Sequence, residues 1–170
     1  MQPILDTTAY AKAVQQLAIA LLERHPNLNN TVLVGIQQGG VVLGWDLVRQ
    51  LRKESGLQDL EMGLLDITFY RDDFRTSILA PDRMNIPFSI EDKTVILIDD
   101  VLFTGRTIRA ALDALVDFGR PAAIQLAVLI DRGHRELPIR ADYVGKNIPT
   151  SLTQDVKVVL EESDKKTDKV

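Results

Sequence analysis

The stretch that decides the fold of this chain reads Val95-Ile96-Leu97-Ile98-Asp99-Asp100-Val101-Leu102-Phe103-Thr104-Gly105-Arg106-Thr107. Its four apolar residues predict a buried strand that ends in two adjacent carboxylates, and a short Thr-Gly loop then leads into a helix. Carboxylates accept hydrogen bonds from hydroxyl groups, and backbone N–H groups at the start of a helix bind phosphate. This layout predicts a ligand with vicinal hydroxyls and a phosphate. The alternative, acids that only cap the next helix, is disfavoured because similar phosphate loops lack a doubled aspartate.

The composition is that of an ordinary globular protein. The 170 residues suffice for one domain with a sizeable core, and 45% apolar and 26% charged residues are typical of soluble proteins. No apolar stretch approaches the roughly 20 residues of a membrane span and no secretory segment is recognised, so we expect a cytoplasmic protein without membrane contact. The absence of cysteine excludes disulfides and thiolate metal sites. A net charge of −4 argues against broad affinity for nucleic acid.

Helical and strand patterns alternate along the chain, which is typical of the α/β class with a largely parallel sheet flanked by helices. The predicted helices span residues 7–24, 41–53 and 107–118. The predicted strands span residues 31–36, 64–70, 95–99, 124–131 and 156–160. Residues 71–83 show no clear periodicity, and residues 147–149 predict a loop. We expect residues 1–170 to form one domain in which residues 163–170 are a frayed tail.

Residues 95–107 resemble the signature of type I phosphoribosyltransferases, enzymes that bind phosphoribosyl pyrophosphate (PRPP). The resemblance implies that Asp99 and Asp100 are catalytic residues that hold the ribose hydroxyls, directly or through waters on Mg²⁺. Because Mg²⁺ prefers a few oxygen ligands together with substrate phosphates, these acids are also the expected metal ligands, mostly through water. The residues expected to bind the 5′-phosphate are Val101, Leu102, Phe103, Thr104, Gly105, Arg106 and Thr107. A Walker-type nucleotide loop is excluded because no strand is followed by Gly-Lys-Ser or Gly-Lys-Thr.

A second glycine-containing turn follows the predicted strand at residues 31–36. Gln38, Gly39 and Gly40 lie between that strand and the next predicted helix, where the type I fold has its pyrophosphate loop. Glycine tolerates unusual backbone angles and lets the backbone approach a ligand closely. Paired glycines at such a turn are often structural, but their place one βα unit before the acidic strand favours a substrate-binding role.

Two further segments carry charged residues near the predicted site. Residues 71–83 are the expected lid, with Arg71 as a catalytic residue and Arg83 as a substrate-binding residue that neutralise the departing pyrophosphate. The alternative for this segment is a solvated loop whose charges only maintain solubility. Arg132, just after the predicted strand at residues 124–131, is expected to contact a nucleobase.

Four longer segments closely resemble the PyrR family of pyrimidine-operon attenuators and uracil phosphoribosyltransferases: residues 66–73, 95–107, 113–121 and 131–149. The resemblance extends from Asn30 to about Leu160. It implies a type I core with a small hood over the base site, and conversion of uracil and PRPP to UMP and pyrophosphate with Mg²⁺. It also implies Arg132 and Val156 as base-binding residues and assembly into at least a homodimer. Many members of the family bind mRNA leaders in response to uridine nucleotides.

Phe103 bears on the choice of base. Purine-salvage relatives carry an acid at this position, four residues after the first aspartate, where it interacts with N7 of the purine. Phenylalanine neither donates nor accepts a proton, so the sequence favours uracil. Hypoxanthine or guanine is the alternative base.

Features expected of an RNA-binding member are only partly present. Gln15 and Ile19 stand where such members often carry Thr and His. A basic group is retained at Arg132, His134, Arg135, Arg140 and Lys146. The glycine turn also lacks an arginine that many attenuating members have, which predicts reduced turnover. The sequence therefore favours a uracil phosphoribosyltransferase with weak RNA binding; the alternative is a UMP-responsive RNA-binding attenuator with little or no enzymatic role.

Overall fold

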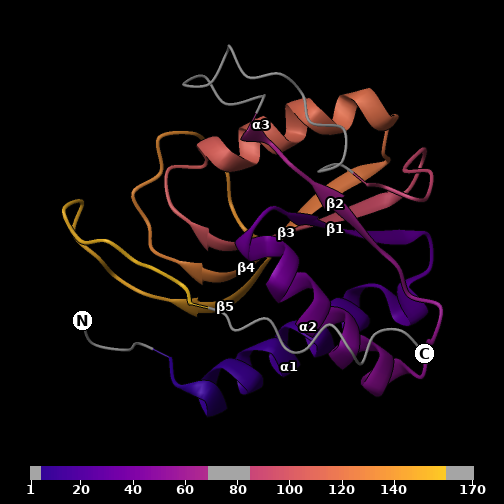
Figure 1. Ribbon diagram of the computed structural model, residues 1–170, viewed down its shortest axis with the longest axis horizontal. Coiled ribbons are helices and arrows are strands. Elements are labelled where there is room, and N and C mark those ends of the chain that lie inside the picture. Colours follow the sequence, from indigo (N-terminus) through magenta and orange to yellow (C-terminus); the bar gives the residue numbers. More distant parts are fainter. Residues whose placement is uncertain (1–4, 69–84, 160–170) are drawn as a thin grey trace.

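The computed structural model describes residues 5–68 and 85–159, which Figure 1 shows as a ribbon. Its elements in chain order are α1 (Thr7–Arg24), η1 (Pro26–Leu28), β1 (Thr31–Ile36), α2 (Gly39–Ser55), β2 (Met62–Leu65), β3 (Thr94–Leu102), α3 (Arg106–Leu115), η4 (Val116–Phe118), β4 (Ala123–Asp131) and β5 (Tyr143–Asn147). None of the described helices has the length and apolar character needed to cross a membrane. The predicted lid at residues 71–83 and the predicted tail at residues 163–170 lie outside the described residues.

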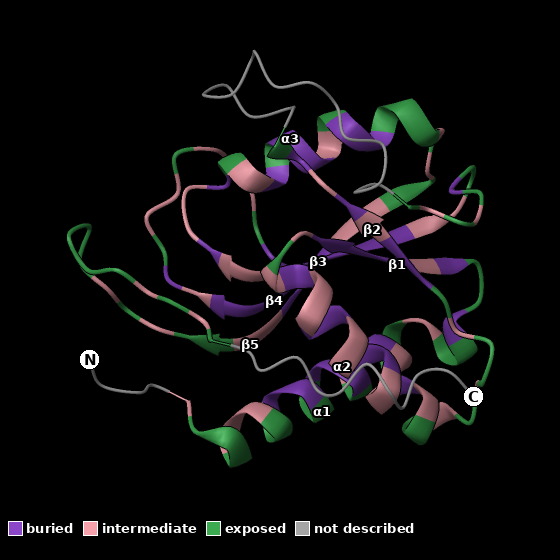
Figure 2. Ribbon diagram, viewed as in Figure 1, coloured by how far each residue is buried: buried purple, intermediate pink, exposed green. Residues whose placement is uncertain are grey.

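The described strands form one five-stranded parallel sheet in the order β2-β1-β3-β4-β5. The central strands β1, β3 and β4 are rich in Val, Leu and Ile, as expected of strands buried on both faces. Helices α1 and α2 pack on one face and α3 packs on the other (Figure 1, Figure 2). Each face has its own apolar cluster, with Leu47 and Ile96 in the first and Leu97 and Leu115 in the second. The predicted α/β class is confirmed.

Local signals set the ends of the helices on the first face. Asp6 caps α1, because its Oδ1 atom accepts a hydrogen bond from the Ala9 N–H at 2.7 Å. Gly56 follows α2 in the left-handed conformation (φ 76°), and its N–H donates to the Arg52 carbonyl. Helix α2 begins at Gly39 rather than at residue 41. The predicted substrate-binding glycines therefore lie in the first turn of this helix.

The strand predicted at residues 64–70 and the helix predicted at residues 107–118 are both shorter in the structure. Strand β2 begins at Met62 and ends at Leu65. It stops there because the Asp66 carboxylate accepts hydrogen bonds from the N–H and the hydroxyl of Thr68, which form a turn. Helix α3 ends at Leu115, and η4 takes up the last three residues of the predicted helix.

The prediction of a final strand at residues 156–160 is wrong over residues 156–159, the part that the structure describes. The edge strand is instead β5, which pairs with β4 and begins at the buried Tyr143. Val156 and Val158 pack against the first apolar cluster without pairing to the sheet. The alternation of apolar residues here therefore comes from an irregular segment that packs on the apolar cluster, and not from a strand. The predicted loop begins at Ile148, because Asn147 is the last residue of β5.

The segment after β5 returns to the carboxyl end of β4. The Ile148 N–H donates to the Asp131 carbonyl at 2.9 Å. The Arg132 guanidinium donates to the carbonyls of Ser151 and Gln154 at 3.1 and 2.5 Å. Residues 148–154 thus lie against the end of β4, where the family resemblance implies a small hood.

The strand order creates a crevice between the ends of β1 and β3. After β1 the chain enters α2 on one face of the sheet, and after β3 it enters α3 on the opposite face. In open α/β sheets, ligands bind where neighbouring connections diverge in this way, at the carboxyl ends of the strands. Residues 37–40 and 99–105 border this crevice. The topology therefore brings the two predicted substrate loops to one site.

Candidate active site

The acidic pair lies near the end of β3. Asp99 is only 6% exposed, and Asp100 is partly buried. Asp99 Oδ1 accepts the Asp100 N–H at 2.9 Å, and Asp100 Oδ1 accepts the Val101 N–H at 2.8 Å. Burial raises the pKa of Asp99 well above its ordinary value, and the negative charge of Asp100 and a hydrogen bond with its side chain raise it further. The ionised carboxylate of Asp99 is costly to bury without a partner. A cation or a hydroxyl donor beside it would lower this cost.

The first turn of α2 packs directly against the acidic pair. A Cβ atom on Gly39 would come within 3.0 Å of the Asp100 Cβ atom and still closer to its carboxylate. A Cβ atom on Gly40 would lie 3.0 Å from the carbonyl carbon of Ile98 and 3.1 Å from Asp99 Cα. Gly40 has no room for a side chain because backbone surrounds it, and at Gly39 a side chain would displace the carboxylate of Asp100. The predicted pyrophosphate turn and the predicted ribose clamp are thus in contact.

Residues 103–105, the 103–105 loop, connect β3 to α3. Gly105 has φ 93°, a conformation that favours glycine, and precedes α3 without a side-chain capping bond. The Thr104 hydroxyl accepts the Arg106 N–H at 3.2 Å, and Thr107 is partly buried in the first helical turn. That turn carries no acidic side chain. The start of α3 is therefore suited to bind an anion through its backbone N–H groups.

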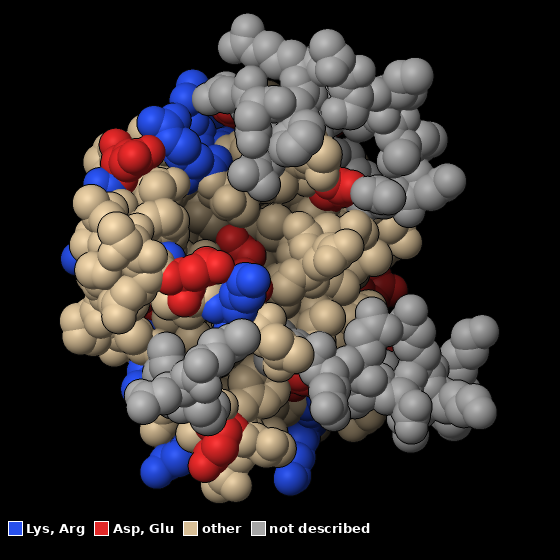
Figure 3. Space-filling view, turned by 60° about the vertical axis from the view of Figure 1, so that its left-hand side comes forward, with Lys and Arg blue, Asp and Glu red and all other residues tan. Residues whose placement is uncertain are grey.

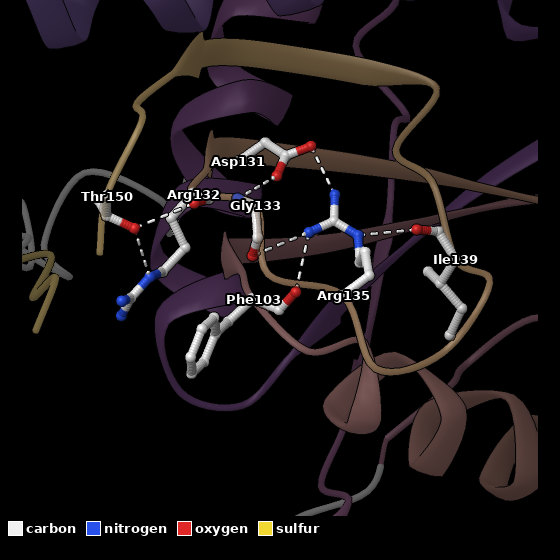
Figure 4. A network of polar contacts seen from close by, with 7 residues as sticks. All are labelled: Phe103, Asp131, Arg132, Gly133, Arg135, Ile139 and Thr150. Atoms are coloured by element: carbon white, nitrogen blue, oxygen red, sulfur yellow. Dashed lines mark hydrogen bonds and ion pairs between the residues drawn. The ribbon is translucent and has the colours of Figure 1, made fainter. Parts of the chain in front are cut away.

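Arg132 is buried beside Phe103, as Figure 4 shows. Its Cζ atom lies 4.0 Å from the centre of the Phe103 ring, which is a cation–π contact. Its Nε atom donates to the Thr150 hydroxyl at 3.2 Å, in addition to the two contacts with the carbonyls of Ser151 and Gln154. A buried arginine needs such partners because an unpaired charge is costly to bury. Arg132 therefore fixes the segment after β5 against Phe103.

Arg135 lies on the backbone side of Phe103 in the same network (Figure 4). Its Nη1 atom donates to the Phe103 carbonyl at 2.8 Å, and its Nη2 atom pairs with the Asp131 carboxylate at 2.6 Å. Residues 131–139, the 131–139 loop, are thereby tied to the 103–105 loop. From the sequence, Arg135 is predicted only as a member of a basic group, and its contacts with Phe103 and Asp131 are not predicted. The one available signal was the spacing of Asp131 and Arg135 around Gly133, which is also common in ordinary turns.

Most predicted site residues gather at the carboxyl end of the sheet. They are Gln38, Gly39, Gly40, Asp99, Asp100, Phe103, Thr104, Gly105, Arg106, Thr107 and Arg132. Val101 and Leu102 belong to β3 rather than to the loop, since β3 continues to pair with β4 as far as Leu102. The Leu102 side chain is buried in the second apolar cluster. Val156 lies in no strand, and Arg71 and Arg83 lie outside the described residues.

Figure 3 brings forward the side of the molecule toward which the strands point in Figure 1. This face is hollowed, and acidic atoms lie within the hollow (Figure 3). The exposed ion pair between Arg106 Nε and Glu136 Oε1, 2.7 Å long, links the start of α3 to the 131–139 loop. The face therefore combines a recessed acidic site with basic side chains, as a ligand with hydroxyls and phosphates requires.

Solved structures of similar shape include purine phosphoribosyltransferases. A hypoxanthine-guanine phosphoribosyltransferase of Bacillus anthracis superposes with a TM-score of 0.70 at 22% identity, covering 88% of this chain and 84% of that one. The hypoxanthine phosphoribosyltransferase of Trypanosoma cruzi gives a TM-score of 0.70 at 21% identity, covering 88% and 82%. At this level of identity the likeness shows the fold alone.

Sequence relatives are much closer. The family model described as the phosphoribosyl transferase domain matches residues 2–165. The bifunctional protein PyrR of Geobacter sulfurreducens is 52% identical over 169 residues, covering 98% of this chain and 95% of that protein. The bifunctional protein PyrR of Bacillus subtilis is 52% identical over 165 residues, covering 95% and 91%. The chain therefore belongs to the phosphoribosyltransferase family and, within it, to the PyrR proteins.

Proposed function

We propose that this protein transfers the phosphoribosyl group of PRPP to uracil and forms UMP and pyrophosphate. The observation that carries the proposal is the contact of Gly39 with Asp100, which joins a glycine turn and an acidic pair beside the start of α3. PRPP carries one group for each feature. Its pyrophosphate suits the glycine turn, its two ribose hydroxyls suit the acidic pair, and its 5′-phosphate suits the start of α3. We also propose, from the family resemblance, a cytoplasmic protein that assembles into at least a homodimer.

Each feature acts on a different part of PRPP in this proposal. Asp99 and Asp100 accept hydrogen bonds from the ribose hydroxyls, and the backbone around Thr104 and Thr107 binds the 5′-phosphate. The first turn of α2 lies where pyrophosphate departs, and Arg71 and Arg83 are proposed to neutralise it. Positioning and electrostatic stabilisation then supply most of the catalysis of a dissociative displacement at the anomeric carbon.

The acidic pair also fits Mg²⁺. Two adjacent carboxylates, one of them buried with a raised pKa, are a hard oxygen donor set that a divalent cation stabilises. We propose that Asp99 and Asp100 hold Mg²⁺ mostly through water. When bound there, the ion supplies charge neutralisation for the phosphates of PRPP.

Phe103 supports a pyrimidine as the acceptor. Its ring packs against Arg132 and meets His134 edge-on, with ring centres 6.2 Å apart. This position therefore offers no proton acceptor to N7 of a purine. Uracil N1 is acidic enough to react without a dedicated buried base. Arg132 and Val156 are proposed to contact the base, as the family resemblance implies.

A panel of bases with Mg-PRPP tests the proposed acceptor. We expect kcat/KM for uracil to exceed that for hypoxanthine or guanine by at least about tenfold, because a missing hydrogen bond at a specific site costs roughly this factor. Chromatography of the nucleotide products measures it, and Asp99→Asn serves as the control with reduced activity. Formation of a purine nucleotide without UMP would show that the pyrimidine assignment is wrong.

RNA is expected to bind weakly, in a salt-sensitive way and with little preference for a hairpin over an unrelated RNA of equal length. Arg132 and Arg135 direct their guanidinium donors to groups within the protein, which leaves fewer cations for phosphate contacts than the sequence implies. Gln15 and Ile19 also replace side chains expected of RNA-binding members. A titration with labelled RNA at about physiological salt measures this. Submicromolar, sequence-selective binding that tightens with UMP would instead support the attenuator function.

A further inference from the structure

In the 103–105 loop, the carbonyl groups of Phe103 and Thr104 point toward the 131–139 loop. The Phe103 carbonyl accepts a hydrogen bond from Arg135 Nη1 at 2.8 Å. The Thr104 carbonyl accepts two hydrogen bonds, from the N–H groups of Glu136 at 2.9 Å and Leu137 at 3.2 Å. One side of the 103–105 loop is therefore occupied by contacts within the protein.

These contacts fix the direction of two backbone N–H groups. In a planar trans peptide unit the C=O and the N–H point in opposite directions, and both units here are trans. The Phe103 carbonyl shares its unit with the Thr104 N–H, and the Thr104 carbonyl shares its unit with the Gly105 N–H. Both N–H groups therefore point away from the 131–139 loop. Within residues 5–68 and 85–159 neither donates a hydrogen bond, so both are available to an anion at the start of α3.

Arg135 is the side chain that holds this arrangement (Figure 4). Besides the Phe103 carbonyl, it binds the Asp131 carboxylate at 2.6 Å and the Ile139 carbonyl at 2.8 Å. A planar guanidinium presents five donors in a fixed fork and can span these acceptors, whereas an ammonium group has no such fork. The side chain is 22% exposed, so these bonds are largely shielded from water.

We infer that Arg135 is a positioning residue for the 5′-phosphate site. Its donors are engaged within the protein, so it acts through the loop rather than on the ligand. By holding the Phe103 carbonyl it turns the Thr104 N–H toward the phosphate, beside the Gly105 N–H, whose direction is set by the N–H groups of Glu136 and Leu137. The inference rests on the proposed function in taking the 103–105 loop as the phosphate-binding loop, and it is independent of which base is used.

Separate titrations of ribose 5-phosphate and pyrophosphate, in buffer with Mg²⁺, test this role by calorimetry. Ribose 5-phosphate carries the 5′-phosphate without a base or a pyrophosphate group. For Arg135→Gln we expect the Kd of ribose 5-phosphate to rise about tenfold, as loss of one or two directed hydrogen bonds implies, with the Kd of pyrophosphate changed less than about twofold. Arg135→Lys should fall between this variant and the wild type. The matched control is Arg140→Gln, an exposed arginine next to the 131–139 loop, which should change neither Kd.

The inference is overturned if Arg135→Gln raises the Kd of both ligands equally, or if it leaves the Kd of ribose 5-phosphate unchanged. If Arg135→Gln does not fold, the same comparison is made with Arg135→Lys. The two quantities are then the ratios of its Kd to the wild-type Kd for ribose 5-phosphate and for pyrophosphate. In steady-state assays the KM for PRPP should rise while kcat changes less than about threefold, a split that general destabilisation does not produce. A wrong base assignment would appear in the base panel and leave these titrations unchanged. A wild-type protein that binds neither ligand overturns both the inference and the proposed function.

Discussion

Asp99→Asn is expected to lower phosphoribosyltransferase activity by at least about tenfold and, at the same time, to raise the free energy of unfolding. Activity falls because a charged hydrogen-bond acceptor worth roughly 1.5–3 kcal/mol leaves the proposed ribose clamp. Stability rises because Asp99 is 6% exposed and its ionised form is costly to bury. Asparagine has nearly the same size, and its Oδ1 atom can still accept the Asp100 N–H. Asp100→Asn should lose a comparable fraction of the activity.

The gain in stability of Asp99→Asn over the wild type should increase as the pH rises. Burial raises the pKa of Asp99 in the folded protein above its ordinary value of 3.8. Such a carboxyl binds its proton more tightly in the folded state, so its ionisation destabilises the fold as the pH rises from the unfolded-state pKa to the folded-state pKa. The stability difference between Asp99→Asn and the wild type should therefore widen as the pH increases above about 4. Urea unfolding at several pH values measures it.

Asp113 provides the matched control for this experiment, because it is an exposed aspartate on α3. Asp113→Asn should leave activity unchanged and alter stability by no more than about 0.5 kcal/mol at any pH. Near-normal activity and PRPP affinity in a folded Asp99→Asn protein would remove Asp99 from the clamp. Equal or lower stability of this variant at about pH 8 would contradict the cost of the buried charge.

The two glycines at the start of α2 should respond differently to alanine. In Gly40→Ala the new methyl group meets the backbone of Ile98 and Asp99, which a central strand cannot move, so we expect a loss of about 1–3 kcal/mol of stability or more. In Gly39→Ala it meets the Asp100 side chain, which can rotate away. This variant should remain folded but lose at least about tenfold in activity, because a displaced carboxylate no longer holds its ligand in a productive position. Thermal unfolding and initial rates measure both effects.

Gly56→Ala is the control for these variants, because it lies at the other end of the same helix. Its φ of 76° disfavours alanine, but a Cβ atom there has no neighbour within 4 Å. We expect a loss of about 1 kcal/mol of stability and full activity per folded molecule. Wild-type activity in Gly39→Ala would show that the contact with Asp100 does not set the position of the clamp.

The parts of the fold that the sequence predicts are those with a strong local signal. Strands β1, β3 and β4 each contain an apolar run followed by a glycine or an aspartate, and their burial on both faces leaves little choice of structure. Strand β5 has no such signal, since Gly145, Lys146 and Asn147 are unfavourable in strands and are held by pairing with β4. Residues 156–159 show the converse case, because the apolar Val156 and Val158 pack against the first apolar cluster and do not pair with the sheet.

The candidate site was predictable in its residue types and not in its contacts. Asp99 and Asp100 are unusual after an apolar run, so the sequence alone marks them as candidate site residues. The requirement for Gly39 comes instead from Asp100, which is far from it in the chain, and only the packing of α2 on β3 reveals it. The role of Arg135 likewise depends on acceptors in two separate loops.

The contact between Gly39 and Asp100 also has a consequence for protein engineering, because it separates the donor half of the proposed site from the acceptor half. A methyl group on Gly39 would displace the Asp100 side chain, so the start of α2 and the end of β3 are one packed unit, the donor half of the proposed site. Mutant libraries aimed at new acceptors should leave this unit constant. They belong at the side chain of Phe103 and at residues 150–154, which are joined through the side chain of Arg132. The backbone of Phe103 belongs to the donor half, because Arg135 holds its carbonyl.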